Sequence, residues 1–169
     1  MPASIVQLQA RVCRLLKQHN RKVVFAESCT GGLVSGALTR TPGISAHHCG
    51  GVVVYRNETK QAYLGVPADL LNDPGPVSET VARLMATGVL AMTPEADIAA
   101  AVTGHLGPRA PAALDGVVYV AIAERGATDQ EPAVIVKRFR WKQPAARAAR
   151  QRLAIAAVLR VLADRLARN

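Results

Sequence analysis

One short segment, FAESCTGG at 25–32, places two hydroxyl groups and a thiol directly after an apolar run. The run KVVFA at 22–26 is typical of a buried strand, and a helix-like segment follows the two glycines. A side chain at such a junction lies beside free helix N–H groups, which bind anions or stabilise an oxyanion. Gly31 and Gly32 would let a ligand approach the backbone closely. The pattern therefore makes Ser28 a candidate nucleophile.

Two other interpretations of this segment stay open. Ser28 or Thr30 would serve equally well as a helix N-cap, because either hydroxyl can accept from free N–H groups. Cys29 is a rival nucleophile, but a catalytic thiol needs a base. The only obvious base for it is the pair His47 and His48, in a segment that we expect to be a surface loop.

A second group of polar residues lies in VVVYRNETK at 52–60. We expect Tyr55 to end a strand, Asn57 to cap a helix, and Lys60 to lie on that helix's first turn. The positive end of a helix dipole lowers the pKa of a lysine, so Lys60 could act as a neutral base toward a serine hydroxyl. The alternative is a solvent-exposed lysine with no catalytic role.

The third group lies in AVTGHLGP at 101–108, where a strand again ends in a hydroxyl, that of Thr103. Gly104 and Gly107 are typical of a loop that lets main-chain N–H groups approach a ligand. We expect this loop to hold a phosphate or a carbonyl.

Strand and helix signals alternate along the chain and would position all three groups. The expected strands are 22–26, 50–55, 96–104, 116–124 and 133–141. The expected helices are an amino-terminal one with Ser4 and Gln7 in a capping box, 31–43, 57–66, one of about fourteen residues from Ser78, and 144–168. This order predicts an α/β fold, a three-layer α/β/α sandwich with a mixed, mostly parallel sheet, in a single domain over 1–169. Ligands bind where the strands of such sheets end.

The composition excludes several classes of protein. Half of the 169 residues are apolar, enough for one sizeable core, and no segment has the length of a membrane span. The three cysteines are widely spaced and the four histidines show no ligand spacing, so we expect no disulfide framework, no metal and a reducing cytoplasm. The amino-terminal helix lacks the apolar core of a signal peptide.

The net charge of +9 comes from the carboxyl-terminal fifth of the chain, where ten basic residues from Lys137 onward face only Asp164. Such a segment is either a solvated helix face or an attractor of phosphate. Nucleic-acid binding is not expected, because no aromatic residue except Trp141 is interleaved with the arginines.

Taken together and in this order, AESCTGG, GGVVVYRNETK, LGV, GPVSE, AVTG and GP resemble the motifs of the CinA C-terminal family of nicotinamide-nucleotide amidases. The resemblance runs from about residue 4 to the end of the chain. Members of that family hydrolyse nicotinamide mononucleotide to nicotinate mononucleotide and ammonia, without a metal. The resemblance implies that Ser28 is the nucleophile and Lys60 its base, with Tyr55 assisting. The candidate substrate contacts are Thr30, Gly31, Gly32, Asn57, Thr103, Gly104, His105, Gly107, Arg109 and Arg150.

The resemblance also implies the partners. The chain looks like the stand-alone form of the family, which lacks a larger amino-terminal domain. We expect it to bind a pyridine nucleotide and to form a homo-oligomer, with no cofactor, membrane or nucleic acid.

The loop after Gly104 departs from the family pattern. The family usually continues with a small apolar residue, AGP and a glycine-rich run, whereas this chain has HLGPRAPAALDG at 105–116. Its prolines offer no N–H group, so His105 and Arg109 would have to replace the missing main-chain donors unless both point into solvent. Near the carboxyl end WKQ replaces Gly-Asp-Arg, and Arg147 or Arg150 would supply the basic residue that often follows. The departures fit an amidase with an altered substrate, or an inactive member that acts as a nucleotide-binding or assembly domain.

Overall fold

A computed structural model describes residues 3–126, 130–143 and 146–168. Within them the strands are β1 (Val23–Glu27), β2 (His48–Val53), β3 (Ile98–Gly104), β4 (Val117–Glu124) and β5 (Ala133–Arg140). The helices are α1 (Ile5–Gln18), α2 (Leu33–Leu38), α3 (Asn57–Leu64), α4 (Ala68–Asn72), α5 (Glu79–Met92) and α6 (Arg147–Leu166), with a 3-10 turn at Ile44–Ala46.

The five strands form one mixed sheet in the order β2-β1-β3-β4-β5. β1 pairs in parallel with β2 and β3, and β4 pairs antiparallel with β3 and β5. Four strands thus share one direction and β4 alone is reversed, which confirms the expected mixed, mostly parallel sheet. The strands β1, β2, β3 and β5 all end at one edge of the sheet, called the site edge below.

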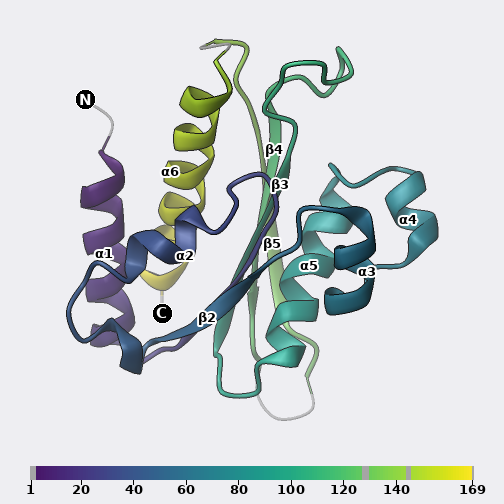
Figure 1. Ribbon diagram of the computed structural model, residues 1–169. Coiled ribbons are helices and arrows are strands. Elements are labelled where there is room, and N and C mark those ends of the chain that lie inside the picture. The colour runs from purple at the N-terminus through teal and green to yellow at the C-terminus, as the bar shows by residue number, and fades with distance from the viewer. Residues whose placement is uncertain (1–2, 127–129, 144–145, 169) are drawn as a thin grey trace.

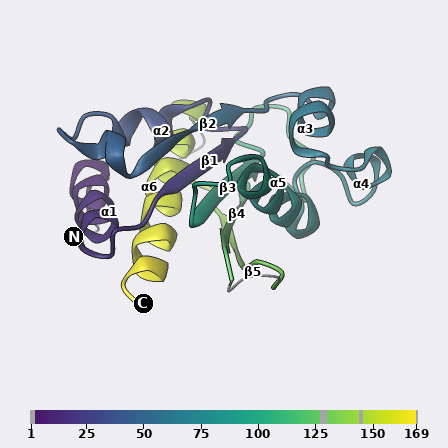
Figure 2. The same ribbon diagram turned by 90° about the horizontal axis from the view of Figure 1, so that it is seen from below.

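Helices cover both faces of this sheet (Figures 1 and 2). One face carries α1, α2 and α6, and the other carries α3, α4 and α5. Each face has its own apolar core, because successive strand residues point to opposite sides. In β3 the run Ala99–Ala101 is fully buried, and these small side chains let helices pack closely on both faces. The three-layer sandwich predicted from the sequence is therefore confirmed.

Two helices begin at the capping residues that the sequence predicted. Ser4 and Gln7 form the capping box of α1. The Ser78 hydroxyl accepts from the Val81 N–H group and caps α5, which has the expected 14 residues. Both caps satisfy N–H groups that a helix start leaves without internal partners.

Other boundaries differ from the sequence prediction. The helix α2 has only six residues and ends at Leu38, before Pro42, and the 3-10 turn at Ile44–Ala46 follows later. β2 begins at His48 and ends at Val53, so Tyr55 lies beyond the strand. Asn57 is the first residue of α3 rather than its cap, because Arg56 occupies the N-cap position. α4 was not predicted, and the predicted start of the last helix, at 144–145, lies outside the described residues.

Candidate active site

The site edge brings together the segments that carry the candidate residues. Glu27 at the end of β1 lies opposite Val53 of β2 and Val102 of β3, so the residues that follow these strands are neighbours. A cavity of about 230 Å³ opens there. Its lining includes Ser28, Cys29, Tyr55, Asn57, Lys60, Pro76, Val77, Thr103, Gly104, His105, Leu106, Gly107, Pro108, Arg109, Ala110 and Arg147.

Lys60 and Ser28 are in direct contact at this cavity. The Lys60 Nζ lies 3.2 Å from the Ser28 Oγ, and Lys60 is only 1% exposed. The same nitrogen donates to the carbonyl oxygens of Val54 at 2.9 Å and Tyr55 at 3.3 Å. Burial lowers the pKa of Lys60. A neutral amine would direct its two N–H groups to the carbonyls and its lone pair to the serine hydroxyl, which is the arrangement of a general base.

The helix that carries Lys60 is held in place by a close approach to α5. A Cβ atom at Gly88 would collide with the carbonyl oxygen of Leu64, the last residue of α3. Gly88 therefore lets α3 lie directly against α5, which fixes the position of Lys60 relative to the sheet.

Cys29 is a poor alternative nucleophile. It is 3% exposed, and burial raises the pKa of its thiol to about 12. His48 Nδ1 accepts from the Gly50 N–H group, so in the neutral ring Nε2 carries the proton and donates to Ser35 Oγ at 2.9 Å. His47 Nδ1 contacts the Arg21 carbonyl oxygen instead. Neither histidine lines the cavity, and neither contacts Cys29 in the described part of the chain.

The turn between β1 and α2 is organised by Glu27, which the sequence reading overlooked. Its buried carboxylate accepts from the Thr30 hydroxyl and from the main-chain N–H groups of Gly32, Val34 and Ser35. The N-cap of α2 is Gly32, with a φ of 92°, so neither Ser28 nor Thr30 is the cap. The helix N–H groups expected to meet a ligand are thus already bonded.

The structure does not bring every predicted contact to the cavity. Thr30, Gly31 and Gly32 lie outside its lining, and Thr30 is fully buried. A signal for Glu27 existed in the sequence: an acidic residue directly after an apolar run and five residues before Gly32 can fold back onto the helix start.

Tyr55 and Arg147 form the exposed rim of the cavity. The Arg147 guanidinium donates to the Tyr55 phenolic oxygen at 2.8 Å and to the Gly107 carbonyl oxygen at 2.7 Å. Tyr55 is 58% exposed, and it contacts Lys60 through its carbonyl oxygen rather than its phenol. The rim therefore joins α6, the loop after β3 and the segment before α3.

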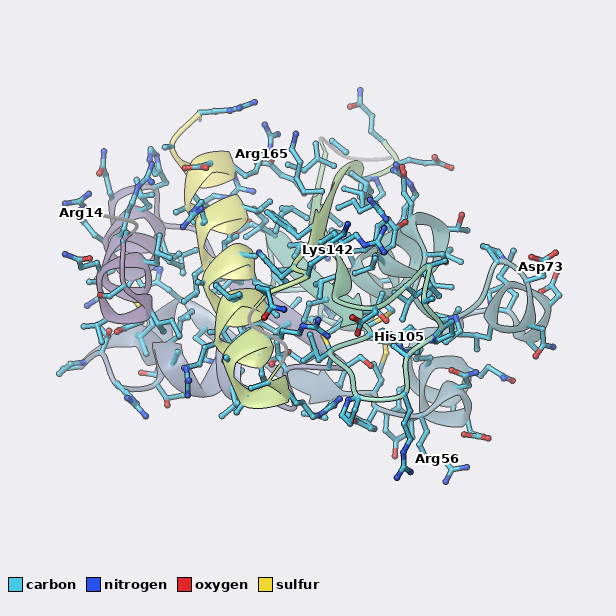
Figure 3. The ribbon with its side chains drawn as sticks, turned by 90° about the horizontal axis from the view of Figure 1, so that it is seen from above. Arg14, Arg56, Asp73, His105, Lys142 and Arg165 are labelled. Carbon is cyan, nitrogen blue, oxygen red and sulfur yellow. The ribbon has the colours of Figure 1, made fainter. Side chains whose placement is uncertain are left out.

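The loop after β3 supplies the opposite wall. The Thr103 hydroxyl donates to the Pro76 carbonyl oxygen at 2.7 Å. His105 and Arg109 both line the cavity, and Arg109 has a left-handed φ of 69°, uncommon for a residue with a side chain. Burial and the nearby Arg147 charge lower the pKa of His105, so its ring favours the neutral form. Figure 3 looks onto the site edge, with His105 over the sheet and Arg56 pointing away from it.

Arg150 lies behind this loop instead of in the cavity. It is 2% exposed and forms a bidentate pair with Asp115, at 2.6 and 3.0 Å. Arg150 also donates to the Lys142 carbonyl oxygen, and a Cβ at Gly107 would lie 2.9 Å from its guanidinium. Arg147 is therefore the arginine of α6 that lines the cavity, and Arg150 supports the loop from beneath.

The electrostatic character of the cavity follows from its lining. The described lining residues include Lys60, Arg109 and Arg147 but no aspartate or glutamate. Such a lining favours an anionic ligand. The described residues contain no cluster of three or more histidine, cysteine or acidic side chains that could hold a metal ion. They also contain no helix long and apolar enough to cross a membrane.

The family model of the CinA C-terminal domain matches residues 5–166 of this sequence. The chain belongs to the CinA C-terminal domain family. CinA-like proteins of Thermotoga neapolitana and a Synechococcus species are 40% and 43% identical to it over 121 and 124 residues, which are 70% and 72% of this chain. The chain spans only 29% of the length of either relative.

Solved structures of CinA proteins share the whole fold. A CinA superfamily protein from Klebsiella pneumoniae has a TM-score of 0.87 at 30% identity, covering 99% of this chain and 100% of that one. The competence/damage inducible protein CihA from Agrobacterium tumefaciens has a TM-score of 0.86 at 34% identity, covering 96% and 95%.

Proposed function

We propose that this chain is a metal-independent amidohydrolase that converts nicotinamide mononucleotide, or a related amide, to the carboxylate and ammonia. Ser28 is the nucleophile and Lys60 its base. The observation that carries the proposal is the 3.2 Å contact between the buried Lys60 amine and the Ser28 hydroxyl in the wall of a cavity. This pairing of a nucleophile with a base of lowered pKa is the arrangement that activates a serine.

The first half of the reaction forms an acyl-enzyme. The neutral Lys60 amine takes the proton of Ser28 as Oγ bonds to the amide carbon, and the carbonyl oxygen becomes an oxyanion. In α/β-hydrolases the main-chain N–H group of the residue after the nucleophile donates to that oxygen, and the equivalent donor here would be that of Cys29. The tetrahedral intermediate collapses when the C–N bond breaks, and the Lys60 ammonium returns its proton to the leaving ammonia.

The second half releases the acid. Water attacks the Ser28 ester and gives a proton to the neutral Lys60, and the second tetrahedral intermediate then expels Ser28 Oγ, which takes the proton back. The products are the carboxylic acid, which loses its proton to solvent and becomes the carboxylate, and the free enzyme. A single amine in contact with the serine can therefore serve both halves without a metal.

The basic cavity lining supports a phosphorylated amide as substrate. Arg109 and Arg147 lie on the loop and rim of the cavity, and as arginines they suit the phosphate end of a nucleotide. Arg147 has only neutral acceptors, the Tyr55 phenol and the Gly107 carbonyl, as hydrogen-bond partners among the described residues. A bound phosphate would give the Arg147 guanidinium a charged acceptor.

An ammonia-release assay tests the proposal. The purified chain is incubated with nicotinamide mononucleotide, its unphosphorylated riboside and other small amides, with and without a chelator. We expect release from the phosphorylated amide, unchanged by the chelator and abolished in Ser28→Ala. If the wild-type protein binds the nucleotide, as measured by calorimetry, but releases no ammonia, the chain is a binding or assembly domain instead.

A further inference from the structure

We infer that Glu27 is a positioning residue that holds the Ser28 hydroxyl against Lys60. Its carboxylate accepts four hydrogen bonds from the turn that contains the nucleophile. The donors are the Thr30 hydroxyl at 2.6 Å and the N–H groups of Gly32 at 3.0 Å, Val34 at 3.2 Å and Ser35 at 2.8 Å. The inference deepens the proposed function and rests on it.

The environment of Glu27 shows that the turn is folded around this carboxylate. Glu27 is 2% exposed and forms no ion pair with a basic residue in the described part of the chain. A buried carboxylate is costly unless hydrogen bonds compensate it, and among the described residues its donors all come from residues 30–35. The carboxylate and the turn therefore stabilise each other.

Hydrogen bonds through Val54 link the Glu27 main chain to Lys60, and Ser28 follows Glu27 directly in the chain. The Val54 N–H group donates to the Glu27 carbonyl oxygen at 2.8 Å, and the Val54 carbonyl oxygen accepts from Lys60 Nζ at 2.9 Å. The Ser28 N–H group donates to the Val102 carbonyl oxygen at 3.1 Å. Main-chain hydrogen bonds to neighbouring strands thus fix residues 27 and 28, where the turn begins. The Glu27 carboxylate fixes residues 30–35, where the turn ends.

This arrangement predicts which kinetic constant depends on Glu27. The Glu27→Gln change keeps the size of the side chain but puts an NH₂ group where main-chain N–H groups donate, so the turn must shift. Misalignment of a nucleophile slows the chemical step, whereas Arg109 and Arg147 still bind the phosphate end. We expect kcat to fall by about tenfold to a hundredfold with KM changed by less than about twofold.

The experiment combines turnover with covalent labelling of Ser28. A fluorophosphonate reacts with an activated serine, and mass spectrometry locates the adduct, so the labelling rate reports the activation of Ser28 without any substrate. We expect Glu27→Gln to lower the labelling rate and kcat by the same factor. Thr30→Val removes only one of the four donors and should lower both by a smaller factor, which also provides a test if Glu27→Gln does not fold.

The matched control is Ser4→Ala, which removes the side-chain cap of α1 far from the cavity. It should lower thermal stability and leave labelling and turnover unchanged, so the comparison separates positioning from general destabilisation.

The outcomes distinguish the two proposals. A wild-type chain whose Ser28 is not labelled and which releases no ammonia overturns the proposed function, and the role of Glu27 with it. If Ser28 of the wild-type chain is labelled, but folded Glu27→Gln or Thr30→Val keeps the wild-type labelling rate and kcat, the role of Glu27 alone is overturned. A rise in KM at constant kcat would also overturn it, because that pattern indicates a contact with substrate.

Discussion

The guanidinium of Arg147 donates to the phenolic oxygen of Tyr55 at 2.8 Å, across 92 positions of the sequence. Because the phenol is bonded to this arginine, we expect Tyr55 to act at the rim of the cavity rather than on the proton of Ser28. We expect Tyr55→Phe to raise the KM for a phosphorylated substrate by about threefold, with kcat nearly unchanged. Steady-state kinetics check this, and a fall in kcat alone would restore the assisting role that the family resemblance implies.

Ser28 and Cys29 are adjacent, and their environments differ in a way that substitution can separate. The thiol is buried with a pKa raised to about 12, whereas the hydroxyl contacts a lysine of lowered pKa. Ser28→Ala should lower kcat by at least about several hundredfold, and Cys29→Ala should retain most activity. Ammonia release measures both. Equal losses in the two variants would contradict the assignment of the nucleophile.

The pH dependence of turnover follows from the lowered pKa of Lys60. Only the deprotonated amine accepts a proton, so kcat should rise with pH and reach a plateau, with a midpoint below the ordinary lysine value of about 10.4. Lys60→Arg keeps the positive charge but cannot act as a base near neutral pH, and should be nearly inactive. The comparison is a pH profile of kcat at saturating substrate. Retained turnover in Lys60→Arg with an altered KM would make Lys60 a charge contact.

Arg109 offers a test of phosphate recognition. It lines the cavity from the loop after β3, so Arg109→Ala should raise the KM for a phosphorylated amide by about tenfold or more and leave kcat almost unchanged. The unphosphorylated analogue serves as the control and should be unaffected. An equal effect on both substrates, or on neither, would mean that this loop does not bind phosphate.

Asp115 should contribute to acid stability. The hydrogen bond from Arg150 holds the pKa of this carboxyl below its usual value, so the unfolded chain binds the proton more tightly than the folded one. The stability from this pair is therefore complete above the usual aspartate pKa of about 3.9 and is lost as the pH falls toward the lowered value. Chemical unfolding at several pH values checks this: the difference between wild type and Asp115→Asn should shrink on acidification. A difference independent of pH would contradict it.

The sequence predicted the fold well because its signals are local. Ser78 and the apolar spacing after it define α5 without reference to the rest of the chain, and the same holds for Ser4 and α1. The pairing of Lys60 with Ser28 also agreed with the sequence reading, since strands that end at one edge bring their next residues together.

The remaining parts of the site depend on contacts distant in the sequence. Arg147 and Arg150 differ by three positions of one helix, and only the packing of α6 decides which faces the cavity. Arg150 is four positions before the buried Ala154, so helical spacing places it on the buried face of α6, but this spacing does not show which arginine lines the cavity. The role of Glu27 depends on the start of α2 donating to its carboxylate; its acidic side chain before Gly32 hints at this contact, but only the folded turn shows the four donors.

The reversed direction of β4 has a practical consequence for protein engineering. Because β3 ends and β4 begins at the site edge, the segment 105–116 leaves and rejoins adjacent, paired strands. Ser28 and Lys60 belong to other segments, around β1 and α3. We therefore expect an exchange of this hairpin between family members to change ligand preference while the strands that carry the nucleophile keep their register, provided that its contacts with Arg147 and Arg150 of α6 are exchanged with it.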